Sequence, residues 1–149
     1  MNISIICVGK IKEKYLTDAI KEYSKRLTPY CKLSIIEVKE STQDDPVEEG
    51  ENIIKKIPSD SYVFSLDMRG NAYTSEQLSK HLDKLALHGN SNLVFIIGGS
   101  NGLSKKVIEK SNELISFSTL TFPHQLIRIF LLEQIYRSFK ISKNEPYHK

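Results

Sequence analysis

The stretch that decides the fold is Phe95-Ile96-Ile97-Gly98-Gly99-Ser100-Asn101-Gly102, an apolar run that ends in a glycine-rich turn. The apolar run favours a buried strand, and the glycines favour a tight connection to the next element. The turn is neither Gly-x-Gly-x-x-Gly nor a P-loop, since no Gly-Lys-Ser/Thr follows. On the glycines alone, a ligand-binding turn and a purely structural connection are equally supported. As a ligand, a neutral, adenosine-like molecule fits better than a phosphate.

Strand and helix patterns alternate along the whole chain. Short apolar runs rich in β-branched residues predict strands over 2–9, 32–38, 62–66, 93–97 and 114–117. Apolar residues at three- and four-residue spacing predict helices over 12–27, 47–57, 74–88, 104–111 and 123–141. We expect a turn at Asp67–Gly70 and a mobile acidic connector at Glu40–Asp45. This alternation predicts an α/β fold, with a parallel sheet and helices on both faces, as one domain spanning residues 1–149.

Composition and charge set broad limits on function. The apolar content of 40% and charged content of 26% are ordinary for a globular protein, and the net charge of +3 permits a nucleic-acid partner without requiring one. Cys7 and Cys31 show no CxxC spacing, so we expect reduced, packed thiols and no metal site. The apolar run Ile3–Val8 is too short for a signal peptide or a membrane span. We therefore expect a cytoplasmic protein with no membrane contact.

The loops after the strands are the candidate ligand site. In a parallel sheet, ligands bind outside the carboxyl ends of the strands, which here are Leu66-Asp67, Gly98–Gly102 and Ser118–Gln125. Apolar side chains of the third loop would wall a pocket, and its backbone groups would be free to meet an adenine edge. Taken alone, this loop is more typical of a connector with Pro123 in the first turn of a helix. His124 alone is more typical of a capping or surface histidine.

The last predicted helix is apolar nearly all round. A helix without a polar face must be covered on more than one side, which predicts a homodimer with this helix in the interface. The alternative is a central helix buried within one subunit. Glu133 and Arg137 are one turn apart and would form an ion pair, or Arg137 would meet an RNA phosphate. The tail holds Tyr147 and His148 side by side, which alone proves little.

Together these features resemble the ribosomal RNA large subunit methyltransferase H family, small members of the SPOUT superfamily of S-adenosylmethionine-dependent methyltransferases. The resemblance covers essentially the whole chain and is most specific in its last third. The matching stretches are Val8–Lys10, Phe95–Leu103, Leu120–Gln125, Arg128, Glu133-Gln134, Tyr136-Arg137 and Pro146–Lys149. The chain departs from the family mainly in a shorter, more acidic connector near Gln43–Gly50, which contains no predicted site residue.

The resemblance implies a fold, a cofactor and a substrate. The fold would be SPOUT-type, with a C-terminal trefoil knot, a rare exception to ordinary chain topology. S-adenosyl-L-methionine would bind to Leu66, Gly98, Gly99, Ser118, Thr119, Leu120, Thr121, Phe122 and Pro123. The protein would be a homodimer, in which the tail of one subunit helps to close the active site of the other. The substrate would be a pseudouridine of 23S rRNA, methylated at N3 in the assembled ribosome.

Three residues are expected to carry catalysis. His148 is the best candidate for the general base, because an unperturbed pKa of about 6.5 suits proton transfer near neutrality. Tyr147 would stack on or hydrogen-bond to the target base. Arg137 would hold a phosphate or stabilise negative charge on the imide carbonyls. The basic residues late in the chain, Arg128 among them, are expected to face the RNA.

Two other classes of protein stay open on the sequence. A non-catalytic ribosome- or nucleotide-binding module on a flavodoxin-like sheet would explain the loops and the mild basicity without the tail. A nucleotide-dependent oxidoreductase is the second, although the dinucleotide fingerprint is missing. Affinity for S-adenosylmethionine over NAD or FMN separates all three.

Overall fold

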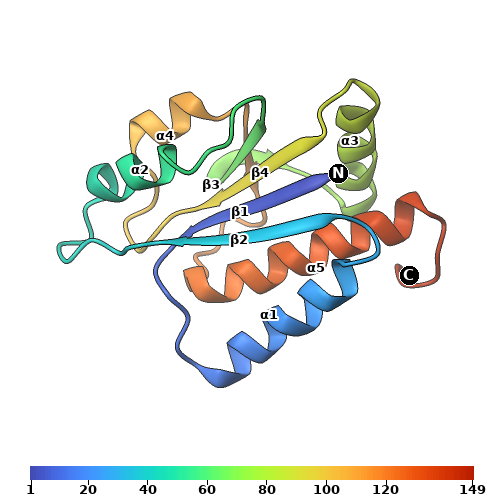
Figure 1. Ribbon diagram of the computed structural model, residues 1–149, viewed down its shortest axis with the longest axis horizontal. Coiled ribbons are helices and arrows are strands. Elements are labelled where there is room, and N and C mark those ends of the chain that lie inside the picture. Colours follow the sequence, from blue (N-terminus) through green and yellow to red (C-terminus); the bar gives the residue numbers. More distant parts are fainter.

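The computed structural model describes all residues, 1–149, and contains one five-stranded sheet in the order β2-β1-β4-β3-β5. All neighbouring strands are parallel: β1 (Asn2–Val8), β2 (Lys32–Val38), β3 (Tyr62–Ala72), β4 (Asn92–Ile97) and β5 (Glu113–Ser116). The helices that join and follow them are α1 (Lys14–Leu27), α2 (Pro46–Ile54), α3 (Ser75–Leu87), α4 (Lys105–Lys110) and α5 (His124–Ser142). In Figure 1, α2 and α4 lie on one side of the sheet and α1 and α5 on the other. The predicted α/β fold is confirmed.

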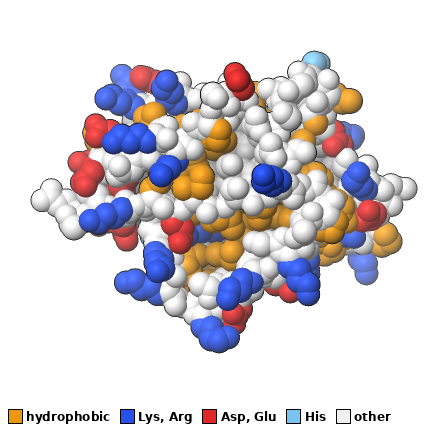
Figure 2. All heavy atoms as spheres, viewed as in Figure 1, with side chains coloured by type: hydrophobic (Ala, Val, Ile, Leu, Met, Phe, Trp, Pro, Cys, Tyr) orange, Lys and Arg blue, Asp and Glu red, His pale blue; other side chains and the backbone are white.

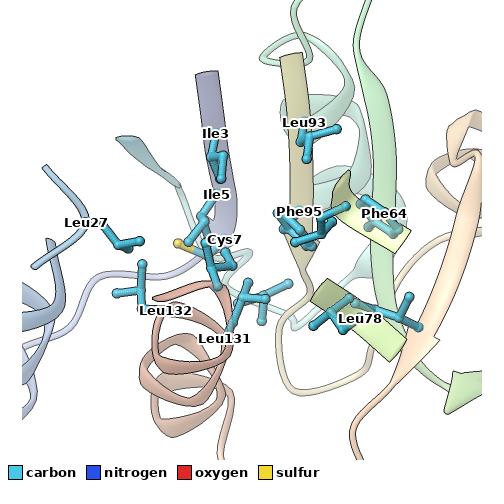
Figure 3. Close-up of a cluster of buried hydrophobic side chains, with 14 of the residues drawn as sticks. Ile3, Ile5, Cys7, Leu27, Phe64, Leu78, Leu93, Phe95, Leu131 and Leu132 are labelled. Carbon is cyan, nitrogen blue, oxygen red and sulfur yellow. The ribbon is translucent and has the colours of Figure 1, made fainter. Parts of the chain in front are cut away.

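Each face of the sheet builds its own hydrophobic core, because side chains of a strand alternate between the two faces. In β4, Leu93, Phe95 and Ile97 join the larger core, to which α1, α3 and α5 contribute. Val94 and Ile96 join the smaller core, to which α2 and α4 contribute. Figure 3 shows the larger core, with α5 placed beside β1 and β4. Burial on both faces explains why this strand is a continuous apolar run in the sequence.

The long helix α5 buries only part of its apolar surface within the chain. Leu131, Leu132 and Ile135 are fully buried, whereas Phe130 is 43% exposed. Hydrophobic side chains also reach the surface in a band between β2 and α1, with Lys and Arg scattered around it (Figure 2). The sheet, α1 and α3 therefore cover one stripe of α5 and leave a second apolar face only partly covered, with Leu126 and Ile129 half-buried and Phe130 exposed. The helix is not the fully enclosed central helix that we considered as the alternative to a dimer.

The strand β3 runs further than the sequence predicted. We expected it to end at Leu66 in a turn over Asp67–Gly70, but pairing with β5 resumes at Asn71 after a register shift. Asp67 still accepts a turn-type hydrogen bond, from a backbone N–H two residues further on, at 2.9 Å. A Cβ on Gly70 would lie 2.4 Å from the backbone of β5, so only glycine allows this approach. The predicted turn is thus a bulge within the strand rather than its end.

Glu113 of β5 fastens the bulged strand to the sheet and to α3. Its carboxylate accepts hydrogen bonds from Tyr62 and Asn71 at 3.2 Å, from His81 at 2.7 Å and from Tyr73. Burial by itself would raise the pKa of Glu113, but the bonds from Tyr73, His81 and Asn71 bring this pKa below its ordinary value. The carboxylate is therefore ionised near neutrality.

Helix ends follow the capping signals with small shifts. Thr74 and Gln77 form the predicted capping box of α3, and Ser104 caps α4. The helix α2 ends at Ile54, three residues before the predicted end. Pro123 lies just before α5 rather than inside it.

The two cysteines are packed, unlinked thiols. Burial raises the pKa of both Cys7 and Cys31 to about 11, so neither is a reactive thiolate near neutrality. Both side chains pack in or against the larger hydrophobic core, as predicted. No group of three or more His, Cys, Asp or Glu side chains is arranged to hold a metal ion. Among the helices, none combines the length and the apolar character that crossing a membrane requires.

Candidate active site

A crevice of about 340 Å³ opens at the carboxyl ends of β4 and β5 and beside the bulge of β3. This volume is within the range of about 300–1,000 Å³ typical of small-molecule sites. Seven of the nine predicted cofactor residues line it: Leu66, Gly98, Gly99, Ser118, Leu120, Thr121 and Phe122. The other two, Thr119 and Pro123, belong to the same loop but do not line the crevice. The three segments that the sequence pattern placed at strand ends therefore meet at one hollow.

Sequence reasoning missed several residues of this crevice. Ile97, Leu103 and Ile127 add apolar wall, and each stands close to a predicted stretch. His124 also lines the crevice, although we expected a capping or surface histidine. Burial, and next the positive charge of Arg128, lower the pKa of His124, so its imidazole is neutral at neutral pH.

The glycines of the turn after β4 serve the protein's own packing. A Cβ on Gly98 would lie 2.8 Å from the carbonyl oxygen of Gly102, and Gly102 has a φ of +78°. A Cβ on Gly99 would lie 3.0 Å from both carboxylate oxygens of Glu49. The two explanations for these glycines, a structural connection and a ligand-binding turn, are therefore compatible. The glycines permit a tight turn, and that turn borders the crevice.

Arg128 anchors the loop that closes the crevice. Its side chain is 2% exposed and donates to the carbonyls of Val8 and Gly9, at 2.7 and 2.6 Å, and to Glu37 at 2.8 Å. The first turns of α5 are thereby held against the carboxyl end of β1, although the preceding strand, β5, lies at the far edge of the sheet. The expectation that Arg128 faces RNA was wrong, because the buried backbone carbonyls at the end of β1 take up its guanidinium.

The three predicted catalytic residues lie together at the other end of α5. Arg137 donates to Glu133 at 2.5 Å, the ion pair that was one of the two alternatives for this residue, and lies 3.1 Å from Nδ1 of His148. Nε2 of His148 lies 2.7 Å from the carboxylate of Glu76. The Tyr147 hydroxyl donates to Glu133 at 3.0 Å, and the guanidinium of Arg137 stands 4.8 Å from the centre of its ring. The tail is thus docked onto its own subunit.

The helix α5 separates these residues from the crevice. Arg137 lies about 20 Å along the helix from His124, at roughly 1.5 Å per residue. Figure 1 shows the C-terminus at the opposite end of the molecule from the loops that follow the strands. A second hollow, of about 330 Å³, lies between them and is lined by Phe122 on the crevice side and by Glu133 on the tail side. One chain therefore does not bring the predicted catalytic residues to its own crevice.

The molecule is an α/β protein with a crevice of ligand size at the carboxyl edge of a parallel sheet and a C-terminal helix that returns to the first strand. The chain belongs to the SPOUT methyltransferase family, since the family described as "Predicted SPOUT methyltransferase" matches residues 1–148.

Named relatives are similar over their whole length. The chain is 55% identical to "Ribosomal RNA large subunit methyltransferase H" of Clostridium botulinum (strain Alaska E43 / Type E3) and 54% identical to "Putative ribosomal RNA large subunit methyltransferase H" of Methanococcus vannielii, with 100% of each chain covered. Both alignments run over 159 positions, against the 149 residues of this chain.

A solved structure has a similar fold. It is a probable methylase family protein from Haemophilus influenzae Rd KW20, with a TM-score of 0.59 and 13% sequence identity. The match covers 99% of this chain and 70% of that one. At this identity the similarity concerns the fold alone.

Proposed function

We propose that this protein is an S-adenosylmethionine-dependent methyltransferase that modifies N3 of a pseudouridine in bacterial 23S rRNA within the assembled ribosome. The observation that carries the proposal is the meeting of the three predicted cofactor segments at one crevice, in a chain of the SPOUT methyltransferase family. The names of the full-length relatives support large-subunit rRNA as the substrate. A protein that modifies ribosomes would be located in the cytoplasm.

The crevice fits S-adenosylmethionine in its chemistry. Apolar side chains, Leu66 and Phe122 among them, suit the adenine ring. The backbone N–H groups of Ser100, which lines the crevice, and of Asn101, the next residue of the turn, donate to no protein acceptor. They are available to the polar groups of a ligand. When bound, the cofactor supplies a methyl group on a sulfonium, so the chain's task is to orient the reactants and manage one proton.

We further propose that the active site is shared between two subunits. The tail residues lie about 20 Å along α5 from the crevice, at roughly 1.5 Å per residue, and α5 leaves an apolar face only partly covered. A homodimer that packs these faces together would cover Phe130 and bring the tail of one subunit to the crevice of the other. Because the crevice and the tail lie at opposite ends of α5, an antiparallel arrangement of the two helices would serve both sites equally.

The tail residues would divide the work on the base. Arg137 would stabilise negative charge on the imide carbonyls or hold a phosphate, and Tyr147 would stack on the base or hydrogen-bond to it. His148 would accept the N3 proton once its nitrogens exchange their present partners for the base. Its present contacts, Arg137 on Nδ1 and Glu76 on Nε2, describe the tail before substrate arrives.

The family's C-terminal trefoil knot is also a proposal for this chain. It is supported by the chain path, since the segment after edge strand β5 returns past β3 and β4 to the end of β1, where Arg128 binds. A crystal structure whose chain, extended from both termini, pulls straight without a knot would contradict it.

The first test is transfer of a labelled methyl group to ribosomes that lack this modification. The full chain is compared with a variant truncated before Pro146. Label in 23S rRNA that disappears with the truncation supports the proposal and assigns catalysis to the tail. Binding of S-adenosylmethionine without any transfer would favour a binding module, and binding of NAD or FMN instead would favour an oxidoreductase.

A mixing experiment tests the shared site. Thr121→Trp fills the crevice from an exposed loop position, and the truncated variant lacks the tail. If sites are shared, each mixed dimer holds one intact crevice facing one intact tail. Subunit exchange of the two inactive variants should then restore about a quarter of wild-type activity, the share of sites expected from random pairing in a two-fold dimer. No recovery in a mixture shown to exchange subunits would contradict the shared site.

A further inference from the structure

A buried carboxyl group stands directly behind the turn that borders the crevice. Glu49 of α2 is 2% exposed, and both its oxygens would lie 3.0 Å from a Cβ on Gly99. Its Oε1 has no hydrogen-bond partner, and its Oε2 accepts only a long bond, 3.5 Å, from the backbone N–H of Ser41. An ionised carboxylate with so little compensation would be expensive to bury.

The charged groups that face Glu49 are acidic. Burial has the largest effect on the pKa of Glu49 and raises it; the hydrogen bond from the Ser41 N–H lowers this pKa, and the nearby negative charges of Glu40, Asp44 and Asp45 raise it, so that the net shift is upward. Toward α4, the neighbouring Gly50 meets the uncharged side chains of Ser104 and Val107. The protonated form is the one that this environment favours.

Glu49 has little freedom to leave this position. Its neighbour Gly50 packs so closely on α4 that a Cβ there would lie 2.4 Å from Oγ of Ser104. On the outer side, the acidic connector is docked on the same turn: the Asp44 carbonyl accepts from the side-chain amide of Asn101 at 2.9 Å, and its carboxylate accepts from Ser100 at 3.4 Å. The turn is thus held between the connector and Glu49.

We propose that Glu49 is a positioning residue for the cofactor turn, which holds Gly98–Gly102 in its binding shape when protonated and releases it on ionisation. The inference rests on the proposed function, because it assigns S-adenosylmethionine to this crevice. An ionised carboxylate at this place would need hydrogen-bond donors, and the unpaired N–H groups of Ser100 and Asn101 belong to the turn beside it. Drawing them inward would take them from the ligand. Cofactor affinity should therefore fall as pH rises.

The test is how the affinity for S-adenosylhomocysteine, an unreactive stand-in for the cofactor, depends on pH. Calorimetry from about pH 5 to about pH 8.5 covers the range in which a carboxyl group with a pKa raised by burial would ionise. The wild type should lose at least roughly fivefold in affinity across this span, because the bound state retains a proton. Glu49→Gln keeps the size and the neutral charge, so its affinity should stay high at every pH. The matched control is Glu51→Gln, an exposed position on the same helix, which should behave like the wild type.

The outcomes separate the inference from the proposed function. Ligand binding with the same affinity at all pH values in the wild type would overturn the role of Glu49 and leave the proposed function standing. A Glu49→Gln variant that binds more weakly than the wild type by one factor at every pH would also overturn it, because a merely structural role predicts that result. Failure of the wild type to bind at any pH would remove the proposed function itself. Should Glu49→Gln not fold, a wild-type affinity that is constant across the span still overturns the inference.

Discussion

Replacing Arg128 with Ala is the sharpest test of how the crevice is built. The substitution removes three hydrogen bonds and leaves two carbonyls, those of Val8 and Gly9, without donors in a region where Arg128 is 2% exposed. Breaking a buried ion pair from one side costs roughly 3–5 kcal/mol. Because Glu37 is 38% exposed and rehydrates, we place the loss at the lower end, about 3 kcal/mol.

The assay is urea and thermal unfolding of the ligand-free protein. A loss of about 3 kcal/mol corresponds to a Tm lower by roughly 6–12 °C in a chain of this size. Arg128→Lys keeps the positive charge but lacks the planar guanidinium, so its stability should lie between those of the wild type and Arg128→Ala. Lys14→Ala, which removes a fully exposed ion pair with Asp18, should leave stability unchanged within error. If Arg128→Ala loses less than about 1 kcal/mol, the anchoring role is refuted.

Three further substitutions test other parts of the structure. Since the pKa of Glu113 is lowered in the folded state, the stability that Glu113 contributes is present above its unfolded pKa of about 4.3 and is lost as pH falls through the folded value. Urea unfolding at about pH 7 and at about pH 3 should therefore show that Glu113→Gln loses less free energy of unfolding on acidification than the wild type does. An equal loss would contradict this. His148→Ala should lower methyl transfer about a hundredfold with cofactor affinity unchanged in calorimetry, because His148 is assigned to the proton of the base and not to the cofactor; an unchanged rate rejects His148 as the base. Gly102→Ala places a Cβ at a φ of +78° and should cost about 1–2 kcal/mol in thermal unfolding and weaken cofactor binding. Gly89→Ala, at a φ of +89° outside the crevice, should lower stability alone; weakened cofactor binding there too would mean that the turn after β4 has no special role.

Most of the fold was predicted from local sequence patterns, because strands and helix ends depend mainly on residues that are close together in the chain. The alternation of apolar runs determined the strands, and the side chains of Thr74, Gln77 and Ser104 begin their helices as expected. The rule that ligands bind at the carboxyl ends of parallel strands predicted that Leu66, Gly98 and Ser118 lie together, and they line one crevice. None of these inferences needs contacts between distant residues.

The features that the sequence did not predict depend on distant partners. Asp67–Gly70 has the composition of a strand end, and only the pairing of Asn71 with β5 turns it into a bulge. Arg128 resembles any helix-surface arginine until the end of β1 is placed beside it. The role of Gly99 likewise depends on Glu49, which lies fifty residues earlier in the chain. Such contacts leave no periodic signal in a single sequence.

The bond between Arg128 and Val8 joins residues 120 positions apart, and it has a consequence for synthesis of the chain. The first strand is made early, yet its carboxyl end obtains its partner only with the last helix. At roughly 5–20 residues per second, synthesis of the 120 intervening positions takes about 6–24 seconds, during which only water can satisfy these backbone carbonyls of β1. Contacts of such long range slow folding, because the chain between them must be ordered before they form. We therefore expect native structure to appear late and all at once, after α5 has left the ribosome that makes it.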